Sequence, residues 1–268
     1  MVGYKNYSWA YLCMAELESI IHAAKSAGKV ITDHFGNTLQ TEQKSIAADF
    51  YTQADLDSER EVLKVLKKAF PKRSIFSEES GIIDRKSEYT FFVDPLDGSN
   101  NFVLGIPNFS VSIGLAMGNK LVAGVIHCPI LNKTYYAQRG KGAFVNGSRL
   151  RVNDISDITK ASVAYSCAYK NSEKYEQKLI RSLRKGNVKR LMQNWSPAYD
   201  FCMLAAGRIE CVISNENDIY DYCAGKLIAK EAGAKITDFM GKPEKDEKAD
   251  TFLATNGTEL HDKFLKVV

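Results

Sequence analysis

Carboxylates and small polar residues gather in one short segment of the 268-residue chain, 94–102, which reads Asp-Pro-Leu-Asp-Gly-Ser-Asn-Asn-Phe. Asp94 and Asp97 flank a proline that stiffens the backbone, and Gly98 allows a tight turn after them. The two carboxylates can therefore converge on one point. Because their charges repel, a cation is expected between them, and oxygen ligands of this kind suit Mg2+. Taken alone, the Asp97-Gly98 pair also fits an ordinary turn.

Two further acidic segments lie at the predicted ends of structural elements. Ser77-Glu78-Glu79-Ser80 follows the strand-like pair Ile75-Phe76, and Asp221 opens a predicted helix. A helix N-terminus favours negative charge, so Asp221 suits a ligand role there. Each segment also has a simpler explanation, a charged surface loop for the first and an N-cap for Asp221. Together the three segments favour a single acidic site.

The elements that must position these acids in the first half of the chain are predicted from hydrophobic spacing. Apolar residues at helical spacing predict a helix that ends near Gly36. A second helix is expected from Asp55 to Phe70, because Pro71 cannot continue it. A polar connection that carries Lys44 and Asp49 joins the two helices. Runs of apolar or alternating residues predict strands at 90–93, 109–117, 121–127 and 134–138, with a hairpin turn at Asn146-Gly147.

After about Leu150 the predicted strands and helices alternate, as in an α/β layer. The strands are expected at 161–165, 209–213 and 235–237, and the helices at 173–183, 197–206 and 222–232. No repeat or flexible linker separates the two parts of the sequence. We therefore expect an N-terminal α+β half, 1–150, and a C-terminal α/β half, 151–268, in extensive contact.

Composition and charge are those of an ordinary globular protein. A formal net charge of +4 is too small to indicate nucleic acid, although one local basic cluster could meet an anionic partner. That cluster comprises Arg181, Arg184, Lys185, Lys189 and Arg190. The six cysteines form no C-x-x-C motif and are expected to be buried free thiols. Without a targeting or membrane-spanning segment, a cytoplasmic location and no membrane contact are expected.

The acidic segments and their order resemble the inositol monophosphatase family of Mg2+-dependent phosphatases. The family's D-P-[IL]-D-G-[ST]-x-N-F segment matches 94–102, its G-E-E-S element matches 77–80, and its W-D-x-A-[AG]-G element matches 220–225. Thr52-Gln53-Ala54-Asp55 looks like the family's T-x-x-D, with Lys44 at the right position before it. The nine-residue segment is highly specific, and the matches run in order from roughly Lys44 to Asp238.

This resemblance implies a layered αβαβα sandwich of the inositol monophosphatase and fructose-1,6-bisphosphatase type, with two or three Mg2+ ions in each site. Carried over, one Mg2+ would be held by Glu78, Asp94 and the Leu96 carbonyl, and a second by Asp94, Asp97 and Asp221. A homodimer and inhibition by lithium are implied as well. The partner is expected to be a small phosphorylated metabolite.

The family's chemistry would be hydrolysis of a phosphate monoester by a metal-activated water, with no covalent intermediate. The water would lie on the Glu78 side, oriented by Ser99 and Asp55, and the leaving oxygen on the Asp221 side. Lys44 could approach the site, although it also fits a solvated loop. Backbone N–H groups of Gly98 and Ser99 would contact the phosphate if these residues open a helix.

The sequence departs from the family where substrate specificity is set. Residues 194–200 replace a small G-[ST]-A-A run that contacts the sugar, with bulky Trp195 beside Ser196. Ser214 stands where those enzymes have a glutamate, so a contact to a substrate hydroxyl would be missing unless Glu216 replaces it. Tyr220 for tryptophan is a milder change. We assign substrate contacts to Gly98, Ser99, Ser196, Ser214 and Asp221.

Inositol monophosphate is therefore one candidate substrate among several. Histidinol phosphate, fructose 1,6-bisphosphate, 3′-phosphoadenosine 5′-phosphate and NADP are the alternatives, and the basic cluster favours a more anionic one. A regulatory protein of the same fold that binds RNA or a transcription complex is a rival from another class, because bacterial relatives have such links. An inactive phosphatase fold is disfavoured because every expected ligand side chain is present.

Overall fold

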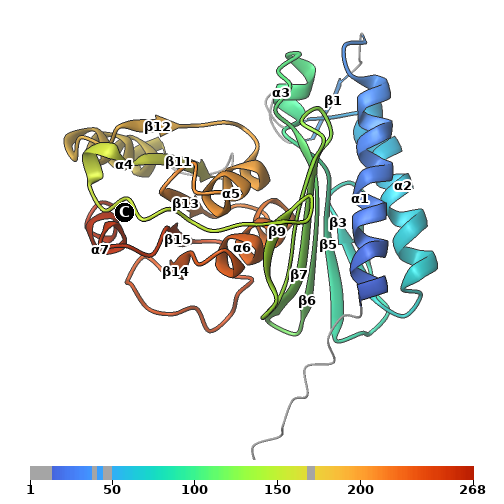
Figure 1. Ribbon diagram of the computed structural model, residues 1–268. Helices are drawn as coiled ribbons and strands as arrows, with labels where there is room; N and C mark the ends of the chain where they lie inside the picture. Colours follow the sequence, from blue (N-terminus) through green and yellow to red (C-terminus); the bar gives the residue numbers. More distant parts are fainter. Residues whose placement is uncertain (1–13, 38–40, 45–49, 168–172) are drawn as a thin grey trace, which may run out of the picture.

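The computed structural model describes residues 14–37, 41–44, 50–167 and 173–268, so Cys13 and Asp49 lie outside the described residues. The elements stack as helices, sheet, helices, sheet and helices (Figure 1). An eight-stranded sheet and a five-stranded sheet enclose two helices, and further helices cover the outer face of each sheet. The expected layered αβαβα sandwich is confirmed.

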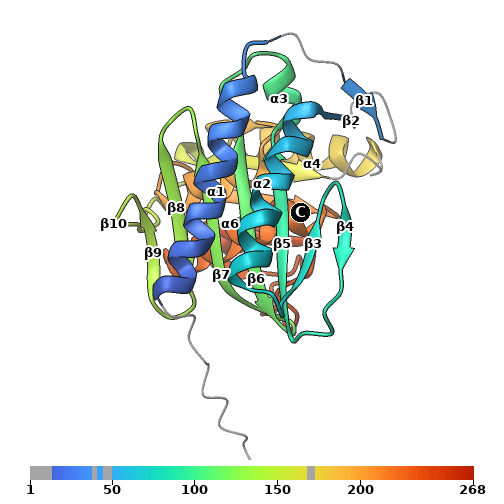
Figure 2. The ribbon, with the colours of Figure 1, turned by 90° about the vertical axis from the view of Figure 1, so that its right-hand side faces the viewer.

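Two long helices, α1 (Met14–His34) and α2 (Gln53–Ala69), pack side by side on the outer face of the eight-stranded sheet (Figure 2). The predicted apolar face of α1 is buried, for example at Leu17. Helix α2 begins two residues earlier than predicted, because Thr52 is its N-cap and forms a capping box with Asp55. It ends before Pro71, as predicted.

The eight-stranded sheet carries the acidic segments at the ends of two of its strands. In spatial order its strands are β10 (Ser148–Arg149), β9 (Gly142–Val145), β8 (Lys133–Gln138), β7 (Lys120–Cys128), β6 (Ser110–Met117), β5 (Tyr89–Asp97), β3 (Ser74–Ser77) and β4 (Gly81–Ile83). Neighbouring strands are antiparallel except for the parallel pair β3 and β5. Because parallel strands end at the same edge, the segments that follow β3 and β5 lie together.

Strand β5 is longer than the predicted run at 90–93. It continues through Pro95 to Asp97, and its pairing with β6 is irregular between Asp94 and Asp97. Proline cannot donate to the ladder, so a bulge at this place is expected, and the Ser58 hydroxyl donates to the Pro95 carbonyl at 2.6 Å. The predicted hairpin turn is confirmed, since Asn146 and Gly147 both have positive φ.

Between the two sheets lie α5 (Pro197–Ala205) and α6 (Ile219–Glu231), which pack against each other. Helix α6 also packs on β6 and β7. A Cβ atom at Gly124 would lie 2.6 Å from the Ala224 carbonyl oxygen, so only glycine permits this approach. Gly124 on β7 thus allows α6 to pack closely on the sheet whose strands β3 and β5 carry the acidic segments.

The second sheet combines parallel and antiparallel strands. In spatial order they are β12 (Arg190–Met192), β11 (Ser162–Cys167), β13 (Cys211–Asn215), β15 (Phe252–Thr255) and β14 (Lys235–Thr237). The first three are parallel, and β15 is antiparallel to both of its neighbours. Strand β13 begins two residues later than predicted. The outer elements are α4 (Glu173–Lys185), α7 (Leu260–Leu265) and the 3-10 turn η1 (Ile158–Lys160).

Three short elements complete the fold. Strands β1 (Thr41–Gln43) and β2 (Phe50–Thr52) form an antiparallel pair, and α3 (Ser99–Val103) follows β5 directly. The predicted division into two halves stays a prediction, because α5 and α6 from the second half pack against the first sheet.

Four cysteines, Cys128, Cys202, Cys211 and Cys223, are buried free thiols, which confirms the expectation for these four. Cys167 is half-buried. No helix within the described ranges combines the length and apolar character needed to cross a membrane.

His261 on α7 lies fully buried between two threonines of the second sheet. Its Nε2 is 2.9 Å from the Thr237 hydroxyl and its Nδ1 is 2.9 Å from the Thr255 hydroxyl. Burial, together with the nearby Lys235 charge, lowers the pKa of His261 to about 4. The imidazole is therefore neutral in the folded protein near pH 7 and ties α7 to the sheet.

We predict that His261 makes the protein acid-sensitive. Between pH 6.5 and about 4 the His261 imidazole is protonated in the unfolded chain but neutral in the folded protein. The contribution of His261 to the free energy of unfolding is therefore complete above pH 6.5 and is lost as pH falls toward about 4. The loss approaches about 3 kcal/mol. Urea unfolding of the wild type and His261→Gln from pH 7 to 4.5 tests it. A stability difference between the two proteins that does not change with pH would contradict the prediction.

Candidate active site

The site is built where β3, β5 and β6 meet the start of α6. The backbone N–H of Glu78 donates to the Val93 carbonyl at 3.0 Å, which places Glu78 beside Asp94. On the other side, Ser112 of β6 pairs with Asp94 in the ladder, and its hydroxyl donates to the Tyr220 carbonyl at 3.2 Å. That contact brings the first turn of α6, and with it Asp221, to the end of β5. The three acidic segments are thus brought together.

Burial and mutual repulsion dominate the electrostatics of these acids. Burial raises the pKa of Asp94 well above its ordinary value, and the charges of Glu78, Asp97 and Asp221 raise it further. Burial likewise raises the pKa of Asp221, with Glu78 and Asp97 adding to the shift. Four carboxylates therefore share one poorly solvated region. Such a cluster is most stable when positive charge lies among them.

Asp97 is held in place by three donors from two parts of the chain. Its Oδ2 accepts from the hydroxyls of Ser110, at 2.9 Å, and of Ser196, and its Oδ1 accepts from the Ala198 N–H at 3.3 Å. Burial raises the pKa of Asp97 to about 6, although these hydrogen bonds oppose the shift. Residues 196–198 open α5, so the inner layer fixes this carboxylate.

Lys44 supplies an ammonium group to the acidic region. Its Nζ lies 2.7 Å from Glu78 Oε1 and 2.6 Å from Glu79 Oε1. Burial by itself would lower the pKa of Lys44, but the two glutamates outweigh it and raise the pKa above its ordinary value. Burial, with the Glu78 charge, raises the pKa of Glu79 to about 7. The lysine is therefore at the site and not merely in a solvated loop.

Asp55 and Ser99 form a hydrogen-bonded pair at the edge of the cluster. The Ser99 hydroxyl donates to Asp55 Oδ1 at 2.8 Å or to the Leu96 carbonyl at 3.0 Å. The N–H and hydroxyl of Thr52 donate to Asp55 Oδ2 at 2.7 and 2.6 Å. Burial raises the pKa of Asp55, and these hydrogen bonds oppose that rise. With its hydroxyl proton committed, Ser99 keeps oxygen lone pairs for another donor.

Gly98 is the N-cap of α3, so Gly98 and Ser99 do open a helix. Gly98 has φ +96, and a Cβ atom there would lie 2.9 Å from the Asn108 carbonyl oxygen. Both the backbone conformation and the close approach require glycine. The contact between these residues and a phosphate stays a prediction.

Ser196 and Ser214, which we assigned to substrate contacts, are both buried with engaged hydroxyls. Ser196 bonds to Asp97, whereas Ser214 donates to the Asp250 carbonyl at 3.1 Å and accepts from the Asn217 side chain at 2.8 Å. The structure therefore gives Ser196 a role toward Asp97 and holds Ser214 within the second sheet. Direct contact of either residue with substrate stays a prediction.

Several residues at the site were not selected from the sequence. Ser110 and Ser112 of β6 contact the site, and the signal for them was two hydroxyls at alternating positions of the strand beside β5. Asp200 is buried and accepts from Asn194 at 2.6 Å, and burial raises its pKa to about 8. His127, by contrast, has a structural position, buried against the Thr134 hydroxyl.

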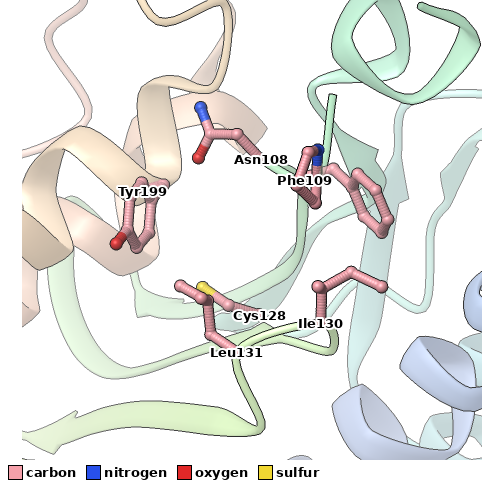
Figure 3. Close-up of a pocket in the computed structure, with 7 residues that line it drawn as sticks. Asn108, Phe109, Cys128, Ile130, Leu131 and Tyr199 are labelled. Carbon is pink, nitrogen blue, oxygen red and sulfur yellow. The ribbon is translucent and has the colours of Figure 1, made fainter. Parts of the chain in front are cut away.

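A small pocket lies beside this region, between the ends of β6 and β7 and the start of α5 (Figure 3). Asn108, Phe109, Cys128 and Tyr199 are among the residues that line it. Its empty volume is about 170 Å³, and none of the proposed cation ligands lines it.

The donors at the site fit Mg2+ in their chemistry. The four acids and the Leu96 carbonyl are all oxygen ligands, which hard cations prefer. Within the described part of the chain, however, no group of three His, Cys, Asp or Glu side chains is arranged to hold a metal ion as it stands.

Comparison with known proteins gives a consistent result. The family model described as "Inositol monophosphatase family" matches residues 14–268. The chain is 33% identical to a fructose-1,6-bisphosphatase/inositol-1-monophosphatase of Thermotoga maritima, over 95% of this chain and 96% of that protein. It is 36% identical to the Nus factor SuhB of Vibrio cholerae, over 84% and 85%. The crystal structure of the extragenic suppressor protein SuhB from Bartonella henselae superposes with a TM-score of 0.87, at 33% identity over 94% and 98%.

We predict that Gly98→Ala destabilises the protein more than Gly81→Ala. Both glycines have positive φ, but the space around Gly81 is open, so only Gly98→Ala adds a clash with the backbone. The strain at Gly81 alone should cost about 1 kcal/mol, and Gly98→Ala should cost about 2 kcal/mol more. Thermal unfolding of both variants measures this. Equal losses of stability in the two variants would show that the Asn108 carbonyl oxygen does not exclude a side chain at position 98.

We also predict that Ser196→Ala weakens the hydrogen bonding of the Asp97 carboxylate and lowers the stability of the protein without unfolding α5. The change removes one of three donors to the buried Asp97 carboxylate, so the Asp97 pKa should rise and the free energy of unfolding should fall by about 1–3 kcal/mol. Unfolding and the NMR titration of Asp97 check this. Ser214→Ala, at another buried hydroxyl, is the control and should leave the Asp97 pKa unchanged.

Proposed function

The chain belongs to the inositol monophosphatase family, and from that premise we propose that it hydrolyses a small phosphate monoester of the inositol monophosphate type with Mg2+. The family supports phosphatase activity and is generally Mg2+-dependent. The observation that carries the proposal is the buried Asp94 carboxylate, which shares its surroundings with the charges of Glu78, Asp97 and Asp221. Clustered carboxylates of this kind can bind divalent cations, and the bound cations can in turn bind a phosphate.

We assign the proposed ligands as the resemblance implies. Glu78, Asp94 and the Leu96 carbonyl would hold one Mg2+, and Asp94, Asp97 and Asp221 another. Bound Mg2+ supplies positive charge for the phosphate and makes a nearby water more acidic. Lys44 already carries one positive charge at Glu78 and would share that carboxylate.

The side chains of the protein orient the reacting water in this proposal. Asp55 accepts a hydrogen bond from the Ser99 hydroxyl, so the lone pairs of Ser99 Oγ can accept a hydrogen bond from the water. The water oxygen attacks phosphorus, and the bond from phosphorus to the alcohol oxygen breaks. Of the two protons of the attacking water, one ends on the leaving alcohol oxygen and the other stays on the phosphate, so the products are the alcohol and inorganic phosphate. Catalysis then consists of positioning and charge neutralisation.

The substrate within this class is the finer part of the proposal. One relative is named for activity on both fructose 1,6-bisphosphate and inositol 1-phosphate, which supports these two as first candidates. Ser214 leaves the second half without a carboxylate at the family's usual position, so histidinol phosphate, 3′-phosphoadenosine 5′-phosphate and NADP stay on the panel. Two or three Mg2+ ions, lithium inhibition, a homodimer and a cytoplasmic location are further proposals from the family.

The proposal predicts phosphate release that depends on both Mg2+ and Asp97. Purified wild type should release phosphate from at least one panel substrate, and a chelator should abolish it. Asp97→Asn should lower kcat/KM at least about 100-fold, because it removes a charge from the cation site.

Asp154→Asn, at an exposed carboxylate in the segment that connects β10 to η1, is the matched control and should retain activity. Absence of phosphate release from every substrate at saturating Mg2+ would overturn the proposal.

A binding role is a second candidate, because one relative is a Nus factor. Five exposed cations in and after α4 could meet an anionic partner in a transcription complex: Arg181, Arg184, Lys185, Lys189 and Arg190. Complementation of a deletion strain by Asp97→Asn discriminates the two. Full complementation without hydrolysis would support binding, and failure would support catalysis.

A further inference from the structure

Asn101 of α3 bridges two backbone segments that lie far apart in the sequence. Its side-chain amide donates to the Asn108 carbonyl at 2.8 Å and to the Asn194 carbonyl, 93 residues further along the chain, at 2.7 Å. The residue is only 2% exposed, and both donors of the amide are used within the protein. Asn101 thus ties the segment that precedes α5 to the segment between α3 and β6.

Asn194, which receives one of these bonds, is held by two further hydrogen bonds. Its carbonyl also accepts from the Asn108 side chain at 3.1 Å, and its own amide donates to Asp200 Oδ1 on α5 at 2.6 Å. Asp200 is buried, so that contact is shielded from water as well. Residue 194 is therefore fixed to the first half of the chain through its carbonyl and to α5 through its side chain.

The residues that follow Asn194 hold a proposed Mg2+ ligand. The Ser196 hydroxyl and the Ala198 N–H both donate to the Asp97 carboxylate. These are two of the three hydrogen-bond donors described above for that carboxylate, and both come from the start of α5. Because only one residue separates Asn194 from Ser196, the place where the Asn194 carbonyl is held decides where these donors lie.

The backbone at Trp195, between these contacts, shows how firmly the segment is held. Its φ is +50, in the left-handed region that bulky side chains avoid. Such a conformation persists only where the surroundings impose it. The residue is 56% exposed, so packing of its side chain is not what imposes the conformation. The hydrogen bonds to the Asn194 carbonyl on one side and from the Ser196 hydroxyl on the other supply the restraint.

We propose that Asn101 is a positioning residue for the cation site, which acts on Asp97 through Asn194 and the start of α5. Mg2+ demands near-ideal octahedral geometry, so a ligand carboxylate that is free to rotate binds the ion more weakly. Both hydrogen bonds of the Asn101 amide go to carbonyls outside the proposed ligand set, so its effect on the cation is indirect. The inference rests on the proposed Mg2+-dependent function.

Mg2+ binding to Asn101→Ala, measured by isothermal titration calorimetry without substrate, tests this inference. Loss of a residue that directly orients a metal ligand costs about 10- to 100-fold in affinity, and Asn101 acts one step further away. We therefore expect the Kd for Mg2+ to rise about three- to tenfold. The Mg2+ concentration for half-maximal phosphate release should rise by the same factor, while kcat at saturating Mg2+ stays within about twofold of the wild-type value.

Two further variants test the route from Asn101 to the carboxylate. If Asn101 acts through the Ser196 hydroxyl, its loss costs little more once that hydroxyl is gone. Asn101→Ala/Ser196→Ala should therefore weaken Mg2+ binding by less than the product of the two single changes. Asn108→Ala removes a half-buried second donor to the Asn194 carbonyl and should raise the Kd about two- to threefold. This second variant decides the question where Asn101→Ala is too unstable to purify.

Asn256→Ala is the matched control for a merely structural role. Asn256 lies just after β15 and is 4% exposed, and its amide donates to Asn153 Oδ1 and to the Ile155 carbonyl, both at 2.8 Å. Neither acceptor belongs to the proposed ligand set. The variant should lower Tm about as much as Asn101→Ala does but leave the Kd for Mg2+ unchanged.

Three results would overturn the positioning role. They are a lowered Tm with an unchanged Kd in Asn101→Ala, equal rises in Kd for Asn101→Ala and Asn256→Ala, and full multiplication of the two effects in the double variant. A wild type that binds no Mg2+ would instead overturn the proposed function.

Discussion

Burial of several like-charged carboxylates in one place is the constraint on which the site depends. Each buried carboxylate loses hydration worth several kcal/mol, and its neighbours repel it. Asp94 has the most unfavourable position, since burial and the charges of Glu78, Asp97 and Asp221 all raise its pKa. The protein offsets part of this cost with serine hydroxyls and backbone N–H groups at Asp97, and with the Lys44 ammonium at Glu78. A cation would offset much of the remainder.

The layered fold makes this concentration of charge attainable. The parallel pair β3 and β5 ends at one edge of the first sheet, and the close approach of α6 at Gly124 brings Asp221 to the same edge. Residues at the start of α5 then reach Asp97 from the inner layer. Because three layers contribute donors and acids, the geometry of the site follows from how the layers pack more than from any one loop.

The short motif around Asp94 could be interpreted from sequence because local chemistry fixes it. A strand, a proline, a glycine at positive φ and a following helix are encoded within nine residues, and the structure has each of them. Element boundaries were less predictable. The β5 strand continues past Asp94 because its bulge accommodates Pro95, and α2 starts early because Thr52 caps it. Both depend on contacts that hydrophobic periodicity does not report.

The sequence by itself determined the family resemblance, and through it the expected layered fold and the candidate acids of the site, because the motifs that carry the resemblance reside in residue types and their local spacing. Only the tertiary structure decided which donors hold those acids: Ser110 and Ser196 on Asp97, Thr52 and Ser99 on Asp55, and Lys44 on Glu78. It also showed that Trp195 is strained and exposed beside the site. The physical reason is that hydrogen bonds between residues distant in sequence, and the burial that shifts their pKa values, arise only when separate layers pack together.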